Sequence, residues 1–277
     1  FKSMYEKYLI IASKKDKAGI NITTNLSQFR KNPVLSSLTS GPNFDFYLVK
    51  DEVIFNKSID PEKIAKYDFI IFASKHQSEK GEKSLSKHAP GNWRIAEFGG
   101  EDEKVCKTSA LFMKQAFEIL NTNVKKYDLK DYKVTLECTH HGPFIDKPCI
   151  FIEIGSNETE WQDRRAGFVI AKTISNVIEK FKLNPYNEIA IGIGGPHYCP
   201  NFNNIQLSSN VALSHIIPGY AAPITEEIIK EAITKTEEEL DFAVLDWKGL
   251  NGEERQRVVN ILEKNYIGWK KTSDIEK

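Results

Sequence analysis

The six histidines of this 277-residue chain are its most informative residues, because each lies where an apolar run breaks into Gly, Pro, Ser or Asn. In an open α/β sheet, ligands bind at the carboxyl ends of the strands, where distant segments converge. Histidine there suits proton transfer near neutral pH and zinc binding. The alternative for any one of them is a partly buried loop residue bonded to backbone. As a set they predict one polar site, built from His76, His88, His140, His141, His197 and His215.

Glu153 is the sharpest single residue, because it interrupts the otherwise apolar run 149–155. An unpaired buried carboxylate is costly, so Glu153 must find a cation, a metal ion or hydrogen-bond donors, or else hold a proton. A carboxylate beside a zinc-activated water could take the proton of that water. We therefore predict a catalytic role for Glu153. The alternative is a structural ion pair with Arg164 or Arg165.

His140 and His141 follow Glu137 in the strand-like run 133–139 and its extension. Neighbouring residues of a strand point to opposite faces, so Glu137 and His141 would share one face and His140 would lie on the other. Both histidines can face one site only if the strand ends there and the chain turns at Gly142-Pro143. Otherwise one of them lies outside the first layer of the site. Glu137 and His141 are the further predicted catalytic residues.

Two other segments suggest contacts with a substrate. Residues 75–94 carry five basic side chains against two acidic ones, with Trp93 beside Arg94. Basic residues with an interleaved aromatic suit a single-stranded RNA end, although a solvated lysine-rich loop would look the same. The glycines at 192–195 allow backbone to approach a ligand closely or simply permit a tight turn. The predicted substrate-binding or tRNA-binding residues are Lys75, Asn92, Trp93, Arg94, Gly194, Gly195 and His215.

The composition narrows the function classes. Lys+Arg and Asp+Glu both number 38, so the total charge does not indicate a strongly basic nucleic-acid binder. No apolar run approaches the roughly 20 residues of a membrane helix, and no signal peptide is visible. The four cysteines lack CxxC spacing and are expected to be reduced cytosolic thiols, with Cys138 and Cys149 as small hydrophobes. The absence of a GxSxG elbow favours hydrolysis by activated water over an acyl-enzyme route.

Predicted strands and helices, which must position these residues, alternate along the chain. This alternation predicts a three-layer α/β/α architecture with a mixed, mostly parallel sheet. We expect a single compact domain over 1–277, with two lobes (about 1–100 and 101–277) as the alternative. Residues 74–100 are expected to form a functional loop, and 196–222 fit no clear element. The predicted strands are 8–13, 44–49, 69–74, 133–139, 149–155, 188–194 and 242–246. The predicted helices are 62–67, 110–120, one long helix from 157 to 181 with a capping box of Asn157 and Glu160, 226–240 and 253–265.

Taken together, the motifs resemble those of the archaeal and plant type of D-aminoacyl-tRNA deacylase. The resemblance runs from about residue 73 to about residue 257 and is specific as a set, whereas the first 70 residues match only in general pattern. It rests on Ala73-Ser74-Lys75-His76, His88-x-x-Gly91-Asn92-Trp93, Thr139-His140-His141-Gly142-Pro143, Phe151-Ile152-Glu153-Ile154-Gly155-Ser156, Glu160-Trp161, Ala166-Gly167, Gly192-Ile193-Gly194-Gly195 with His197-Tyr198, His215-Ile216-Ile217-Pro218 and Asp246-Trp247-Lys248-Gly249.

The resemblance implies a zinc-dependent, cytoplasmic and monomeric enzyme with a phosphorylase/hydrolase-like fold. It would hydrolyse the ester that links a D-amino acid to the tRNA 3′ end, with broad D-amino-acid specificity, in proofreading and detoxification. His76, His88, His140, His141 and His197 are the expected zinc ligands. One departure is Pro196, where the family has glycine, because proline removes a backbone donor.

Two other functions remain compatible with the residues. The first is a metal-independent, peptidyl-tRNA-hydrolase-like enzyme in which Asn92 and a histidine orient water. The second is a non-catalytic tRNA-binding accessory protein, which rests on the basic segment 75–94 alone.

Overall fold

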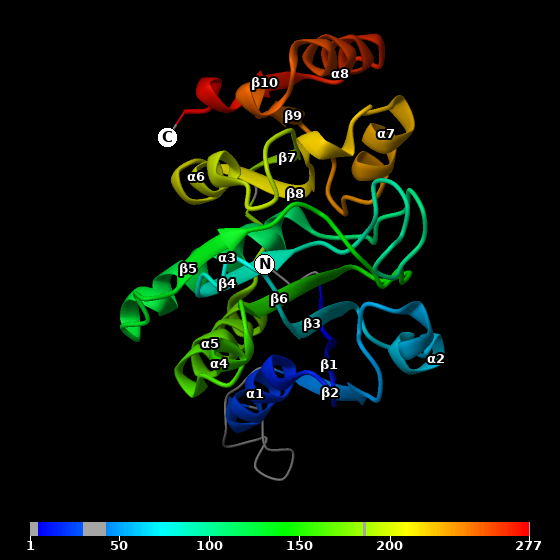
Figure 1. Cartoon of the computed structure of the whole chain (residues 1–277). Coiled ribbons are helices and arrows are strands. Elements are labelled where there is room, and N and C mark those ends of the chain that lie inside the picture. Colours follow the sequence, from blue (N-terminus) through cyan, green and yellow to red (C-terminus); the bar gives the residue numbers. More distant parts are fainter. Residues whose placement is uncertain (1–4, 30–42, 185–186, 277) are drawn as a thin grey trace.

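The chain folds into two β-sheets with helices on both sides (Figure 1). The structure is a computed structural model that describes residues 5–29, 43–184 and 187–276. In Figure 1 the smaller sheet lies above the larger one. The α/β class and the mostly parallel pairing predicted from the sequence are confirmed, although the strands divide between two sheets.

The larger sheet has the strand order β2-β1-β3-β6-β4-β5. Every neighbouring pair is parallel except β4 and β6, which are antiparallel. Its inner strands are buried except at Lys75, the last residue of β3, and burial on both faces is what the continuous apolar runs of β1, β3 and β6 predict. The strands are β1 (Tyr8–Ser13), β2 (Phe44–Val49), β3 (Phe69–Lys75), β4 (Ser84–His88), β5 (Lys133–Leu136) and β6 (Cys149–Gly155).

The smaller sheet has the order β10-β9-β7-β8 and is parallel throughout. Its strands are β7 (Glu188–Ile193), β8 (Val211–Ile217), β9 (Phe242–Leu245) and β10 (Trp269–Lys271). The helices are α1 (Lys17–Leu26), α2 (Pro61–Ile64), α3 (Ala110–Lys126), α4 (Glu158–Trp161), α5 (Arg164–Lys180), α6 (Pro200–Ser208), α7 (Glu226–Thr234) and α8 (Gly252–Lys264).

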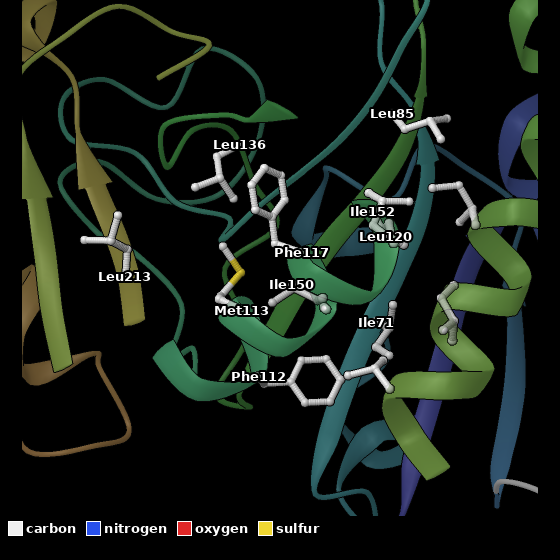
Figure 2. Close-up of a cluster of buried hydrophobic side chains, with 14 of the residues drawn as sticks. Ile71, Leu85, Phe112, Met113, Phe117, Leu120, Leu136, Ile150, Ile152 and Leu213 are labelled. Carbon is white, nitrogen blue, oxygen red and sulfur yellow. The ribbon is translucent and has the colours of Figure 1, made fainter. Parts of the chain in front are cut away.

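Helix α3 joins the two sheets through one hydrophobic cluster. Figure 2 shows Phe112, Met113 and Phe117 of α3 between Leu213 of β8 and the strands of the larger sheet. Burying such side chains contributes roughly 1.5–3 kcal/mol each, so this shared cluster fixes one sheet against the other. The ends of β5 and the loop after β7 are thereby held next to each other, as the hydrogen bond from Cys138 N to His197 O shows.

Most predicted elements are present, although some end elsewhere, as α7 does at Thr234 instead of residue 240. Two predictions are wrong, and one stretch had no prediction. The predicted loop 74–100 contains β4, which the alternation of Ser, Leu, Ser, Lys and His did not reveal as a strand buried on both sides. The predicted single helix 157–181 is two helices, because the Asp163 side chain accepts from Arg165 N and caps α5. The unassigned stretch 196–222 contains α6 and β8. The capping box of Asn157 and Glu160 is present as predicted.

None of the helices in the described part of the chain combines the length and apolar character needed to cross a membrane.

Candidate metal and catalytic centre

The register of the larger sheet brings two histidines beside Glu153. Strand β6 lies between β3 and β4, and Glu153 pairs with Ser74 on one side and Ser86 on the other. His76 and His88 each follow their serine by two residues, so they emerge on the same face as Glu153. Oε2 of Glu153 lies 3.7 Å from Nδ1 of His76 and 3.8 Å from Nε2 of His88.

Glu137 joins this group from β5. Leu136 pairs with Lys87, so Glu137 continues the strand beside His88. Oε1 of Glu137 lies 3.2 Å from Nδ1 of His76 without the alignment of a hydrogen bond. Its Oε2 lies 2.8 Å from Nε2 of His197 and 3.4 Å from Nε2 of His140. Both glutamates are buried, so these imidazoles are their means of stabilising a negative charge.

His140 and His141 both bend into the site, which decides between the two geometries that the sequence left open. Strand β5 ends at Leu136, and His141 takes a positive φ of 41°, so strand alternation no longer applies. The His140 ring lies 4.0 Å from that of His88 and 4.5 Å from that of His197 between centroids. The rings of His141 and His88 are 4.8 Å apart.

The backbone sets the tautomer of three of these rings. Nδ1 of His88, His140 and His141 lies 3.1, 2.8 and 2.7 Å from the carbonyl oxygens of Ala89, Cys138 and Gly142. A carbonyl can only accept, so each Nδ1 carries the hydrogen and each neutral ring keeps its lone pair on Nε2. Metal-binding histidines commonly donate their other ring N–H to backbone in this way.

Burial keeps two of the three rings neutral. Loss of hydration lowers the pKa of His141 to about 4, with the neighbouring His88 adding to the effect. It lowers the pKa of His140 well below the ordinary histidine value for the same reasons. Burial alone would raise the pKa of Glu153, but the neighbouring imidazoles of His76 and His88 outweigh it and lower that pKa, so the carboxylate is ionised at neutral pH.

This donor set fits zinc. One nitrogen from each of His88, His140 and His141 can be chosen so that all three lie within 4.8 Å of one another. Nε2 of His88 is buried and has no hydrogen-bond partner among the described residues. Three imidazole nitrogens with an open fourth position match the ligands of catalytic zinc. Two further groups are equally compact, namely Cys138 with His140 and His197, and His76 with Glu137 and Glu153.

His197 lies at the edge of this histidine and glutamate cluster, next to residues that the sequence analysis did not predict. Its Nδ1 lies 3.3 Å from the Tyr220 hydroxyl and 3.5 Å from Sγ of Cys138. Burial would lower its pKa, but hydrogen bonding to Cys138 and Glu137 raises that pKa to about 10. The hydroxyl of Tyr198 lies 2.8 Å from Nε2 of His76. Cys138 is buried as expected of a small hydrophobe, yet its sulfur belongs to the site.

His215 lies outside the group. It is fully buried, with Nδ1 3.1 Å from the Thr139 hydroxyl and Nε2 3.4 Å from Lys235 O. It therefore has no surface to offer a tRNA in this structure. Its contact with Thr139 supports the segment that carries His140 and His141.

The backbone N–H groups of the two glycines predicted to approach a substrate are already hydrogen-bonded within the protein. Gly194 N donates to Ile217 O, and Gly195 N donates to Gly249 O. Their φ values are 101° and 82°, and a Cβ on either would lie within 3 Å of Asp246. They therefore permit a tight turn, which is the alternative weighed from the sequence. The turn delivers His197, so its role here is positional.

In the basic segment 75–94, some of the predicted substrate-binding residues make internal contacts and others line a cavity. Lys75 lies 3.4 Å from Glu52, and Arg94 contacts Ala221 O, Pro223 O and Glu103. Arg94 nevertheless lines the cavity described next. Asn92 and Trp93 line a cavity of about 480 Å³ that His140 and His141 also line. Nδ2 of Asn92 donates to Gly99 O and Glu101 O. The alternative ion pair of Glu153 with arginine does not form among the described residues, since Arg165 pairs with Asp131 and Asp163.

Comparison with known proteins shows the family of the chain. The chain is 37% identical over 270 residues to a D-aminoacyl-tRNA deacylase of Pyrococcus furiosus, covering 90% of this chain and 93% of that protein. It is 32% identical to the D-aminoacyl-tRNA deacylase of Methanocaldococcus jannaschii, covering 96% and 99%. The crystal structure of a conserved protein of unknown function superposes with a TM-score of 0.85 at 30% identity, covering 98% and 99%. The sequence profile of the D-aminoacyl-tRNA deacylase family matches residues 63–270, and the chain belongs to that family.

Proposed function

We propose that this chain hydrolyses the ester bond of D-aminoacyl-tRNA, releasing the D-amino acid and the tRNA, with zinc held by His88, His140 and His141. The observation that carries the proposal is the pairing of three backbone-oriented imidazoles with an ionised, buried carboxylate, Glu153. His197 and Glu137 lie next to this set and can add ligands. Family membership supports the substrate class.

The metal and the protein side chains have different roles in the proposed hydrolysis. When bound, zinc supplies Lewis-acid chemistry, since it polarises a carbonyl oxygen and lowers the pKa of a water toward about 7. Glu153 is buried, ionised and 3.8 Å from Nε2 of His88, a nitrogen that would hold the zinc, so this carboxylate can take a proton from the attacking water. The same carboxyl group can return that proton to the ribose oxygen as the ester C–O bond breaks. His76, 3.7 Å away, orients this carboxylate.

The proposed partner is the acceptor end of tRNA. His140 and His141 line one cavity, and Asn92 and Trp93 form part of its wall. An enzyme that acts on charged tRNA works where translation occurs, so we place it in the cytoplasm, in proofreading against D-amino acids.

Hydrolysis of paired substrates tests the proposal. D-Tyr-tRNA and L-Tyr-tRNA are incubated with the enzyme, with and without a chelator. We expect release of D-tyrosine, little release of L-tyrosine, and loss of both with chelator, restored by added zinc. Equal cleavage of the two substrates, or of neither, would contradict the substrate assignment. Chelator-resistant cleavage would instead favour the metal-independent alternative.

A further inference from the structure

Exposed apolar side chains gather at one cavity. Among the described residues, eight large hydrophobic side chains are exposed, and three of them line the cavity beside the histidines. These are Ile95, Phe98 and Tyr220, which are 74%, 65% and 64% exposed. Scattered apolar residues are ordinary on a surface, whereas a cluster of them around a cavity indicates a binding site.

The loop that carries Phe98 is held in place by its backbone. Gly142 N donates to Phe98 O, Asn92 Nδ2 donates to Gly99 O, and Ala96 N donates to the Asp102 carboxylate. Gly99 has a φ of 74°, and a Cβ there would lie 2.0 Å from Ile54 O. The Phe98 ring is therefore presented to solvent from a fixed backbone, which lowers the entropy cost of binding a ligand.

Tyr220 forms another part of the wall. It lies in the short 3₁₀ helix Gly219–Ala221, and its hydroxyl reaches His197 and Cys138. One end of this side chain thus touches the catalytic group while the rest lines the cavity. A ligand in this cavity would therefore lie next to His140 and His141, which line it too.

We propose that this cavity binds the terminal adenosine of the tRNA, with the adenine base stacked on Phe98. The inference rests on the proposed function and names the part of the substrate that this cavity recognises. Two groups flank the ester, the amino-acid side chain and the terminal nucleoside, and only the nucleoside is the same in every substrate. Unpaired bases are commonly recognised by stacking on aromatic side chains, and a cavity of about 480 Å³ has the size of a small-ligand site.

Phe98→Ala tests the assignment, with two esters that differ only in the leaving group. We expect KM for 3′-O-D-tyrosyl-adenosine to rise about tenfold while kcat stays within about twofold, because one base stack is lost. Hydrolysis of D-tyrosine methyl ester, which has no base, should stay unchanged. Phe98→Trp should restore the wild-type KM. Tyr266→Ala removes a 98% exposed ring outside the cavity lining and serves as the matched control.

Direct binding separates this proposal from the proposed function. Calorimetry with adenosine 5′-monophosphate should show binding to the wild type that Phe98→Ala weakens about tenfold, even if no ester is cleaved. Equal losses on both esters would assign the cavity to the amino-acid side chain and overturn the proposal. Unchanged kinetics on both esters together with unchanged nucleotide binding would overturn it as well.

Discussion

His88 and Glu153 lie on neighbouring antiparallel strands, with Nε2 of the imidazole 3.8 Å from Oε2 of the carboxylate. Glu153 pairs in register with Ser86, so His88 is its diagonal neighbour on the same face. Both groups are buried on rigid strands. A proposed zinc ligand and a proposed base are therefore held at a fixed separation before any substrate arrives, and the backbone need not reorganise to bring them together.

Glu153→Gln should remove turnover while preserving the fold. The amide has nearly the same volume but cannot take a proton from water, so we expect kcat to fall by about 10²- to 10⁴-fold, as for a lost general base. Deacylation of D-Tyr-tRNA measures the rate, and circular dichroism checks the fold. Glu254→Gln is the matched control, because Glu254 is also buried, with 5% exposure against 1% for Glu153, but accepts from Ile224 N and Arg257. Full activity in Glu153→Gln would make Glu153 structural.

Zinc should bind the wild type and be lost from a ligand variant. After dialysis, elemental analysis should find at least one equivalent of zinc fewer in His88→Asn than in the wild type. Zinc should also raise the Tm of the metal-free wild type, because it binds the folded chain. At a zinc concentration of 100 times Kd, the free energy of unfolding should increase by about 2.7 kcal/mol. His215→Gln serves as the control and should keep the metal. Equal zinc in all three proteins would remove His88 from the ligand set.

Gly142→Ala should disturb the segment that carries His140 and His141. A Cβ there would lie 2.2 Å from Gly100 N and 2.3 Å from Ile54 O, and neither backbone atom can move aside alone. We expect a loss of about 2 kcal/mol or more in the free energy of unfolding, with weaker zinc binding. Gly252→Ala is the control, because nothing lies within 4 Å of a Cβ there and alanine favours the start of α8. Denaturant unfolding compares the two, and equal stability would contradict the packing described here.

Acid should destabilise the chain in part through His215. Burial, the largest influence, lowers its pKa to about 4 in the folded chain, against 6.5 for an unperturbed histidine. Between these values the unfolded chain binds more protons, so stability is lost as the pH falls from about 6.5 to about 4. The free energy of unfolding lost over this pH range is about 3 kcal/mol. His215→Gln should lose less stability than the wild type over this window in urea unfolding, and identical pH profiles would disprove the assignment.

The sequence alone determined the local elements and the chemistry on offer. Strands β1, β2 and β6 have the predicted ends. For β1 and β6 the reason is that long buried apolar runs bounded by turns leave little choice of structure. Glu153 stood out because a carboxylate inside such a run must find a compensating group. The capping box of Asn157 and Glu160 was equally local.

Only the tertiary structure decided which of these residues meet. Strand β4 escaped prediction because its Ser-Leu-Ser-Lys-His pattern carries no apolar run, yet its antiparallel insertion beside β6 is what places His88 against Glu153. The grouping of Cys138, His197 and Tyr220, and the exclusion of His215, depend on how the smaller sheet packs on the larger one through α3. Such contacts span many residues of sequence and arise from shared burial, which no local pattern encodes.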